Sequence, residues 1–315
     1  MDRNEFLNRV AAINVWRRGD SRAPHKPLLL LLALGRVTRG EARLAGYGSD
    51  VEQQLTVLLE RFGRPRVNHH PDQPYCRLPK DGLWEVPGIE DLPLTRGGTA
   101  SVPALRETVG GFPDAAYELL RGDPTLVENA VRAVLDAHFP PSLHSDIRGA
   151  VGLPDYLHDP ARAEDPWTAH GPQVKETTST ARDPRFRRRV LRAYERRCAV
   201  CDFDVRIEDQ LLGLEAAHIK WHAAGGPDRV PNGLAMCSFH HKALDIGALG
   251  LEKKGRDVAV LISSEVNGRS EAVRQLRDLR GVPLRRPQGP ELAPDVEFVA
   301  WHRREVFREP ALGAG

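Results

Sequence analysis

The sequence predicts an α+β protein made of two units, and three observations lead to that prediction. The first half of the chain repeats apolar residues mainly at helical spacing. The second half gathers cysteines and histidines among short segments typical of strands and helices. A stretch between the two halves has no apolar periodicity. A length of 315 residues also fits two domains of roughly 150 residues each.

Helices are expected in the first half over 3–18, 26–37, 50–63 and 113–138. Pro27 suits the first turn of the second helix, and Gly63 ends the third. The Asp-Gly pair at 81–82 precedes alternating apolar residues, which predicts a turn into a strand over 81–86. This half is therefore expected to be mostly helical, with a small β component.

The stretch 155–180 is rich in Pro, Ser, Thr and charged residues, which is typical of a linker. We place the linker at 161–180, between domains at 1–160 and 181–315. Elements expected in the second domain are a helix over 183–196, the stretch 211–221, a helix that carries His240 and His241, a strand over 256–263 and a helix over 271–279.

Composition narrows the class of protein. A hydrophobic content of 41% and a charged content of 28% are typical of globular domains. The most apolar stretch, 25–37, is too short to span a membrane. Residues 1–10 do not resemble a secretory signal, so we expect a cytoplasmic protein. In that compartment, the four cysteines favour metal binding or redox chemistry over disulfides.

Charge is distributed unevenly. Residues 1–165 carry 20 Lys and Arg against 23 Asp and Glu, whereas residues 166–315 carry 25 against 20. The basic excess is greatest over 181–197, directly before the first cysteine of the second half. Such a block can bind a phosphate backbone or form the solvated face of a helix, and the sequence leaves both interpretations open.

Four residues have the spacing of zinc ligands. Cys198 and Cys201 are separated by two residues, and so are Cys237 and His240. Two such pairs allow four soft ligands to close a tetrahedron around one ion. The sequence therefore predicts a structural zinc. The alternative is a set of ordinary buried thiols with a histidine at the surface.

His218, Asn232 and His241 occur in that order within and directly after this framework, in "LEAAHIKWH" and "PNGLAMCSFHH". This motif resembles the HNH nuclease family, whose core is the ββα-metal finger. The resemblance implies that His240 faces the zinc and that His241 binds a catalytic divalent cation such as Mg²⁺ or Mn²⁺. It makes His218 the general base, since an imidazole with a pKa near ~6.5 suits that task. It also implies that Asn232 holds the finger loop and orients His218 through a hydrogen bond.

One position departs from the family pattern. Many HNH nucleases have an acidic metal ligand directly before the catalytic histidine, where this chain has Ala217. Glu215 lies two residues earlier, and Asp245 is spaced to share a helix face with His241. The remaining cation ligands, and the choice among Mg²⁺, Mn²⁺, Co²⁺ and Ni²⁺, stay open.

Two stretches of the first half, 23–37 and 69–88, resemble the sulfur-binding domain of phosphorothioate-dependent restriction enzymes. Recognition of a soft, poorly hydrated sulfur needs an apolar wall beside ordinary phosphate contacts. The resemblance implies walls from Pro74 and Tyr75, and contacts from His25, Lys26, Arg77, Gly98 and Ser101. The alternative reading packs Pro74 and Tyr75 into the core and leaves Lys26 solvated. Trp84 is expected in the core.

The two resemblances together predict a type IV restriction endonuclease of the McrA-like HNH class. It would bind phosphorothioate-modified double-stranded DNA and cut nearby. An HNH endonuclease for methylated DNA is a second reading, which an aromatic content of 6% disfavours. A zinc-stabilised DNA-binding protein without catalysis is a third. A homodimer is a further expectation, because one finger cuts one strand at a time.

Overall fold

The computed structural model describes residues 1–16, 19–95, 100–154, 183 and 185–313. The chain divides into two compact units. The first consists of Met1–Arg18 and Ala23–Ser179, and the second of Gly19–Arg22 and Thr180–Gly315. The domain bounds at 160 and 181 remain predictions, and the expected linker lies outside the described residues.

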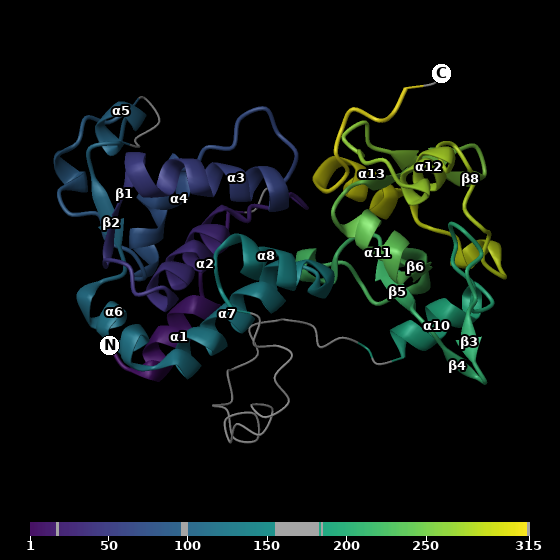
Figure 1. The fold of residues 1–315 in the computed structure, drawn as a ribbon, viewed down its shortest axis with the longest axis horizontal. Coiled ribbons are helices and arrows are strands. Elements are labelled where there is room, and N and C mark those ends of the chain that lie inside the picture. Colours follow the sequence, from purple (N-terminus) through teal and green to yellow (C-terminus); the bar gives the residue numbers. More distant parts are fainter. Residues whose placement is uncertain (17–18, 96–99, 155–182, 184, 314–315) are drawn as a thin grey trace. The chain divides into compact units, whose positions relative to one another are not determined.

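The first unit is a helical domain with one small pair of strands (Figure 1). Its helices are α1 (Arg3–Ala11), α2 (His25–Thr38), α3 (Glu52–Phe62), α4 (Asp72–Arg77), α5 (Val102–Leu105), α6 (Asp114–Gly122), α7 (Pro124–His138) and α8 (His144–Ala150). Helix α2 contacts α3, α4, α6 and α7. The run Leu28–Leu34 of α2 is buried along its whole length, so this helix forms the centre of the core.

Strands β1 (Leu44–Gly46) and β2 (Val109–Gly111) pair antiparallel at the edge of this core. The strand predicted over 81–86 is wrong, because only Glu85 forms a β-bridge there, to Gly111. The segment before it is helical, with α4 continuing into a 3₁₀ turn over Leu78–Asp81. The alternation of apolar and polar residues over 81–86 therefore reflects which side chains are buried, and not pairing with another strand.

The helices predicted over 3–18 and 113–138 differ from the observed ones in length. Helix α1 ends at Ala11. The helix predicted over 113–138 is split into α6 and α7 at Asp123. The carboxylate of Asp123 accepts a hydrogen bond from the backbone N–H of Leu126. Pro124 begins α7, since its missing N–H costs nothing in a first turn.

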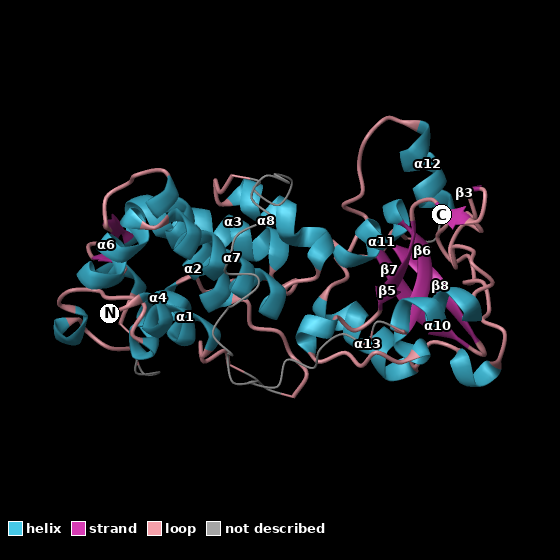
Figure 2. Cartoon of the chain, turned by 90° about the horizontal axis from the view of Figure 1, so that it is seen from below, coloured by secondary structure: helices cyan, strands magenta, loops and turns pink. Residues whose placement is uncertain are grey.

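The second unit is built around a ββα element (Figure 2). Strands β5 (Leu214–His218) and β6 (Gly233–Cys237) pair antiparallel, with Leu214 opposite Cys237 and His218 opposite Gly233. Helix α11 (Ser238–Asp245) follows directly and contacts both strands. The remaining elements are α10 (Phe186–Ala193), β3 (Arg206–Ile207), β4 (Gln210–Leu211), β7 (Leu249–Lys254), β8 (Asp257–Ile262), α12 (Glu271–Asp278) and α13 (Val296–Glu305).

Helix α10 packs closely on the β5–β6 hairpin, and Gly233 makes this approach possible. A Cβ atom at Gly233 would lie 2.5 Å from Cγ2 of Val190 and 2.9 Å from Cζ of Phe186. Contacts that short do not occur between real atoms, so a larger residue would push α10 away from the sheet. Helix α10, which lies within the basic stretch 181–197, is thus packed against the strands that carry His218 and Cys237.

A four-residue segment between α1 and α2 belongs to the second unit, which the sequence did not predict. Its Arg22 is buried, and its guanidinium lies 4.1 Å above the ring of Trp221. The guanidinium also donates to the backbone oxygen of Glu305 at 2.8 Å. Trp301 holds the same segment by donating from Nε1 to the backbone oxygen of Asp20 at 2.8 Å.

Candidate metal centre and active site

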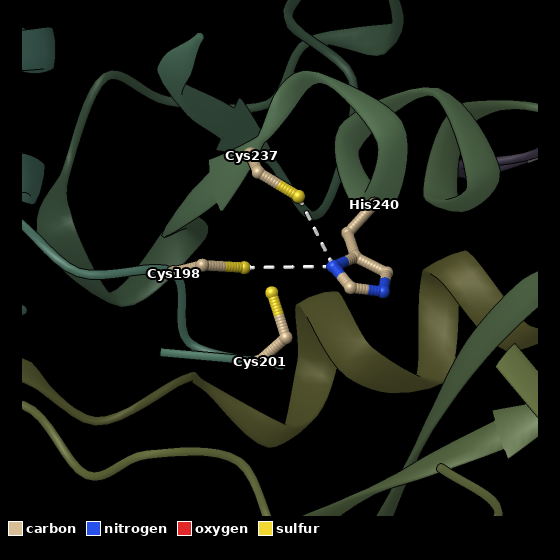
Figure 3. Close-up of side chains that lie close together, drawn as sticks. All are labelled: Cys198, Cys201, Cys237 and His240. Atoms are coloured by element: carbon tan, nitrogen blue, oxygen red, sulfur yellow. Dashed lines mark hydrogen bonds between the residues drawn. The ribbon is translucent and has the colours of Figure 1, made fainter. Parts of the chain in front are cut away.

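Three cysteines and one histidine converge in the second unit. The ligand atoms of Cys198, Cys201, Cys237 and His240 all lie within 4.8 Å of one another. Nδ1 of His240 lies 3.2 Å from Sγ of Cys237 and 3.7 Å from Sγ of Cys198 (Figure 3). Hydrogen bonds from Cys201 and Cys237 lower the pKa of the Cys198 thiol, which favours the thiolate. Three sulfurs and one imidazole nitrogen fit a tetrahedral ion such as zinc.

The two ligand pairs meet because the turn of the first pair is bonded to the strand that ends in the second. The backbone N–H of Ala199 donates to the oxygen of Ala235 at 2.7 Å, two residues before Cys237. The turn is closed by a bond from the N–H of Asp202 to the oxygen of Cys198 at 3.0 Å. His240 follows in the first turn of α11, where its ring reaches the sulfurs.

His241 points to different partners from its neighbour. Its Nδ1 lies 2.5 Å from Oε2 of Glu215, and its Nε2 lies 3.2 Å from Oδ2 of Asp245. Burial lowers the pKa of His241, but hydrogen bonds to Asp245 and Glu215 outweigh burial and raise it to about 9. Ala217, at the position where many HNH nucleases have an acidic metal ligand, is fully buried. An imidazole between two carboxylates is a donor set that divalent cations accept.

His218 ends β5 and belongs to another group of contacts. Its Nε2 lies 2.7 Å from Oδ1 of Asp228. Its ring stacks on Phe186 of α10, with centroids 4.1 Å apart and planes 15° apart. The ring of His222 lies 5.8 Å away. Asp228 and Phe186 were not expected from the sequence, since no characteristic spacing joins either of them to His218.

Asn232 is fully buried and holds the finger loop. Its Oδ1 accepts from the backbone N–H of Lys220 at 2.8 Å, and its Nδ2 donates to the oxygens of Lys220 and Pro227 at 3.0 Å each. These bonds fit the expectation that Asn232 fastens the loop. The expected hydrogen bond to the His218 side chain is not among them, because the amide is used by the backbone. Orientation of His218 comes from Asp228 and Phe186.

The basic residues proposed for the first unit are partly engaged already. Nε2 of His25 lies 3.0 Å from the oxygen of His69, and burial lowers the pKa of His25 to about 4. With this pKa, His25 is neutral at pH 7 in the DNA-free domain, and its contact with DNA stays a prediction. Nζ of Lys26 lies 2.5 Å from Oδ2 of Asp81. Arg77 is exposed at the end of α4.

Pro74 and Tyr75 are both buried. The Tyr75 ring has no exposed surface and lies 4.7 Å from the ring of Tyr47 and 5.7 Å from that of Trp84, centroid to centroid. The expectation that the Tyr75 ring faces sulfur is therefore wrong, and the core alternative holds for it. Trp84 lies in the core as expected.

The downstream loop is described only in part. Ser101 is half-buried at the start of α5, whereas Gly98 lies outside the described residues. The structure adds three residues that were not predicted. Arg66, His69 and His70 lie near His25 and act in the same direction as burial, lowering its pKa.

Residues 3–156 match the family model of the ScoMcrA-like DNA sulfur-binding domain, and residues 198–252 match that of an HNH endonuclease. The chain joins a ScoMcrA-like DNA sulfur-binding domain to an HNH endonuclease domain. The second match covers the cysteine and histidine ligands and the ββα element.

Solved structures similar to the sulfur-binding domain carry the same domain name. The "Sulfur binding domain of ScoMcrA complexed with phosphorothioated DNA" is 26% identical, with a TM-score of 0.42, over 47% of this chain and 95% of that one. The corresponding SprMcrA domain is 26% identical, with a TM-score of 0.41, over 49% and 95%.

The "Type IV phosphorothioation-dependent restriction endonuclease ScoMcrA" is 27% identical, with a TM-score of 0.39, over 47% of this chain and 32% of its own. Among curated proteins, nothing matches the chain. Across the described ranges, each helix is too short or too polar to cross a bilayer.

Proposed function

We propose that the protein is a type IV restriction endonuclease that binds phosphorothioate-modified double-stranded DNA and hydrolyses phosphodiester bonds nearby. The observation that carries the proposal is the presence of a sulfur-binding domain and an HNH domain in one chain. The similar domains of ScoMcrA and SprMcrA are bound to phosphorothioated DNA in their solved structures. We place this activity in the cytoplasm.

Sulfur recognition is assigned to the region where α2 and α4 begin. Lys26 and Arg77 would contact phosphate oxygens, while the neutral His25 would give a hydrogen bond or a van der Waals contact to the poorly hydrated sulfur. Pro74 would form an apolar wall, with Tyr75 packed in the core near it. Gly98 and Ser101 are kept as the proposed loop contacts.

The hydrolytic step is assigned to His218, Asn232 and His241. His218 would take a proton from the water whose oxygen attacks phosphorus, while the bond from phosphorus to the 3′ oxygen breaks. Asn232 keeps the loop beside His218 in place through its bonds to Lys220 and Pro227. A divalent cation such as Mg²⁺ or Mn²⁺, held by His241 with Glu215, would supply positive charge for the departing oxygen. The products would carry 5′-phosphate and 3′-hydroxyl ends.

The ion held by Cys198, Cys201, Cys237 and His240 is proposed to be zinc. These residues join the turn before β3, the end of β6 and the start of α11. Ligands from three segments hold the ββα element together, so the role of this ion is structural.

DNA outside the sulfur site is proposed to contact α10. Arg187 and Arg189 donate to the backbone oxygens of Leu214 and Asp228, at 2.9 and 2.7 Å, and so fix the helix. Arg188 and Arg192 are exposed and one helical turn apart. Both arginines lie on the face of α10 opposite the buried Phe186 and Val190, so they are open to a phosphate backbone.

The test uses matched duplexes that are unmodified, cytosine-methylated or carry one stereodefined phosphorothioate. Binding is measured without divalent metal, and nicking is measured with Mn²⁺ or Mg²⁺. We expect tighter binding and faster nicking of the phosphorothioate duplex. Equal binding to all three would reject sulfur recognition, and preference for the methylated duplex would favour the methyl-dependent reading. Sedimentation of the DNA complex would show whether two copies assemble for a double-strand cut.

A further inference from the structure

Asp228 contacts the imidazole that the proposed mechanism uses as base, and no family match or sequence motif assigns it a role. Oδ1 of Asp228 lies 2.7 Å from Nε2 of His218. Only 14% of the His218 side chain and 12% of the Asp228 side chain are exposed. A hydrogen bond so shielded from water is stronger and better directed than one at an open surface.

Asp228 is itself held from several sides. Its Oδ2 accepts from the backbone N–H of Asp183 at 2.5 Å, and its backbone oxygen accepts from Arg189 at 2.7 Å. The residue before it, Pro227, is bound through its oxygen by Asn232. The carboxylate is therefore a fixed acceptor, and its position does not depend on His218 alone.

The charge state of this carboxyl determines the direction of the hydrogen bond. Burial raises the pKa of Asp228, but hydrogen bonds from Asp183 and His218 outweigh burial, so its pKa is lowered overall. An ionised carboxylate can only accept, so Nε2 of His218 must donate. A neutral imidazole protonated on Nε2 carries its basic lone pair on Nδ1.

Phe186 fixes the plane of the same ring. Its stacking on His218, with planes 15° apart, opposes tilting of the imidazole. The bond to Asp228 opposes a 180° rotation of the ring about Cβ–Cγ, which would put Cε1 in the place of Nε2 and Cδ2 in the place of Nδ1. The bond to Asp228 and the stacking on Phe186 together hold the ring in one orientation, with its basic lone pair on Nδ1.

We propose that Asp228 is the positioning residue of His218, holding the tautomer in which Nδ1 is the proton acceptor. In the hydrolytic step, the attacking water gives its proton to Nδ1, its oxygen bonds to phosphorus and the bond to the 3′ oxygen breaks. This inference rests on the proposed function, because it takes His218 as the general base. The side chain of Asp228 does not touch the reacting atoms.

The first test compares Asp228→Asn with the parent in the full-length chain. The amide can no longer enforce donation from Nε2, so we expect the maximal nicking rate to fall about 100-fold, with DNA affinity unchanged. Asp257→Asn is the matched control, since it removes an exposed ion pair with Arg286. The control should nick within about twofold of the parent.

A double-mutant cycle separates positioning from a structural effect. If Asp228 acts through His218, Asp228→Asn should cost nothing further in a His218→Ala background. An equal loss in both backgrounds would overturn the proposal. Thermal unfolding and zinc content of each variant show whether the domain is still folded.

A second readout does not depend on cleavage. The ¹⁵N shifts of the His218 ring, assigned by comparison with His218→Ala, should show a protonated Nε2 and an unprotonated Nδ1 in the parent. Asp228→Asn should show a mixture of tautomers. A proton on Nδ1 in the parent would reject the proposal. A parent that nicks no DNA with any divalent metal would reject the proposed nuclease activity, while the ring shifts would still decide the role of Asp228.

Discussion

The metal centre and the sulfur region were both expected from short motifs. The predicted residues lie together in the first region, but several predicted residues of the second are buried or already paired. In the HNH domain, all four expected ligands converge on one point. In the sulfur-binding domain, Tyr75 is in the core, His25 is neutral and Lys26 is already paired with Asp81. Metal coordination tolerates few geometries, so ligand spacing predicts position well. An anion pocket is assembled from dispersed side chains whose burial the sequence does not reveal.

Removing the metal should have the largest effect, and it should be confined to one domain. Cys198→Ser is expected to unfold the HNH domain, because structural zinc contributes about 10 kcal/mol or more, comparable with the stability of a whole domain. Helices of the sulfur-binding domain should survive. Metal analysis and two-phase thermal unfolding measure this. Cys76→Ser, which changes the cysteine outside the cluster, should leave the metal content at one zinc per chain.

His241→Ala should slow catalysis strongly and leave the zinc in place. Loss of the proposed cation ligand should slow nicking by about 100-fold or more, since metal stabilisation of the developing charge provides several kcal/mol. Zinc content and binding to phosphorothioate DNA should not change. If instead zinc is lost as well, His241 would be part of the same centre as His240.

Tyr75→Ala and Arg77→Ala should distinguish a residue of the core from a residue that contacts DNA in the sulfur-binding domain. The first should destabilise the domain by about 3–5 kcal/mol, as expected for a buried aromatic side chain. The second should leave thermal stability unchanged and weaken DNA binding about 10-fold, through loss of a charged hydrogen bond. Calorimetry and binding titrations distinguish the two. A stable Tyr75→Ala protein that has lost only sulfur selectivity would restore Tyr75 as a contact residue.

Arg188→Ala with Arg192→Ala should lower the affinity for modified and unmodified duplexes equally. Loss of about two phosphate contacts should reduce the slope of log affinity against log salt by about two. Binding at several salt concentrations gives this slope. A change in sulfur selectivity would place these arginines at the recognition site and contradict their assignment to the HNH domain's backbone contacts.

The smallest expected effect concerns pH. The pKa of His25 is lowered to about 4 in the folded protein, so His25 stays neutral between pH 7 and about 5. DNA affinity should therefore not rise through a charged His25 over this range. Stability should fall as pH drops from about 6.5 toward 4, because the unfolded chain binds the proton first. His25→Gln should reduce that fall, as measured by denaturation at each pH.

Several features could be predicted because they depend on local chemistry. The apolar pattern over 26–37 predicted the helix α2, and the spacing of cysteines and histidines predicted a metal centre. The prediction of a strand over 81–86 was wrong. This segment forms a single β-bridge, from Glu85 to Gly111 of β2, and does not pair with another strand along its length. The long helix expected over 113–138 was interrupted at Asp123 by a capping bond that the apolar pattern does not register.

The sequence by itself determined which atoms are available: three thiols and an imidazole for one ion, a second imidazole beside it, and a further histidine within the same motif. Only the tertiary structure decided what surrounds them. It brought Asp228 and Phe186 to His218, packed Tyr75 into the core and joined Gly19–Arg22 to the second unit. Contacts of this kind form between segments distant in sequence, where packing and burial set the partners and no spacing rule applies.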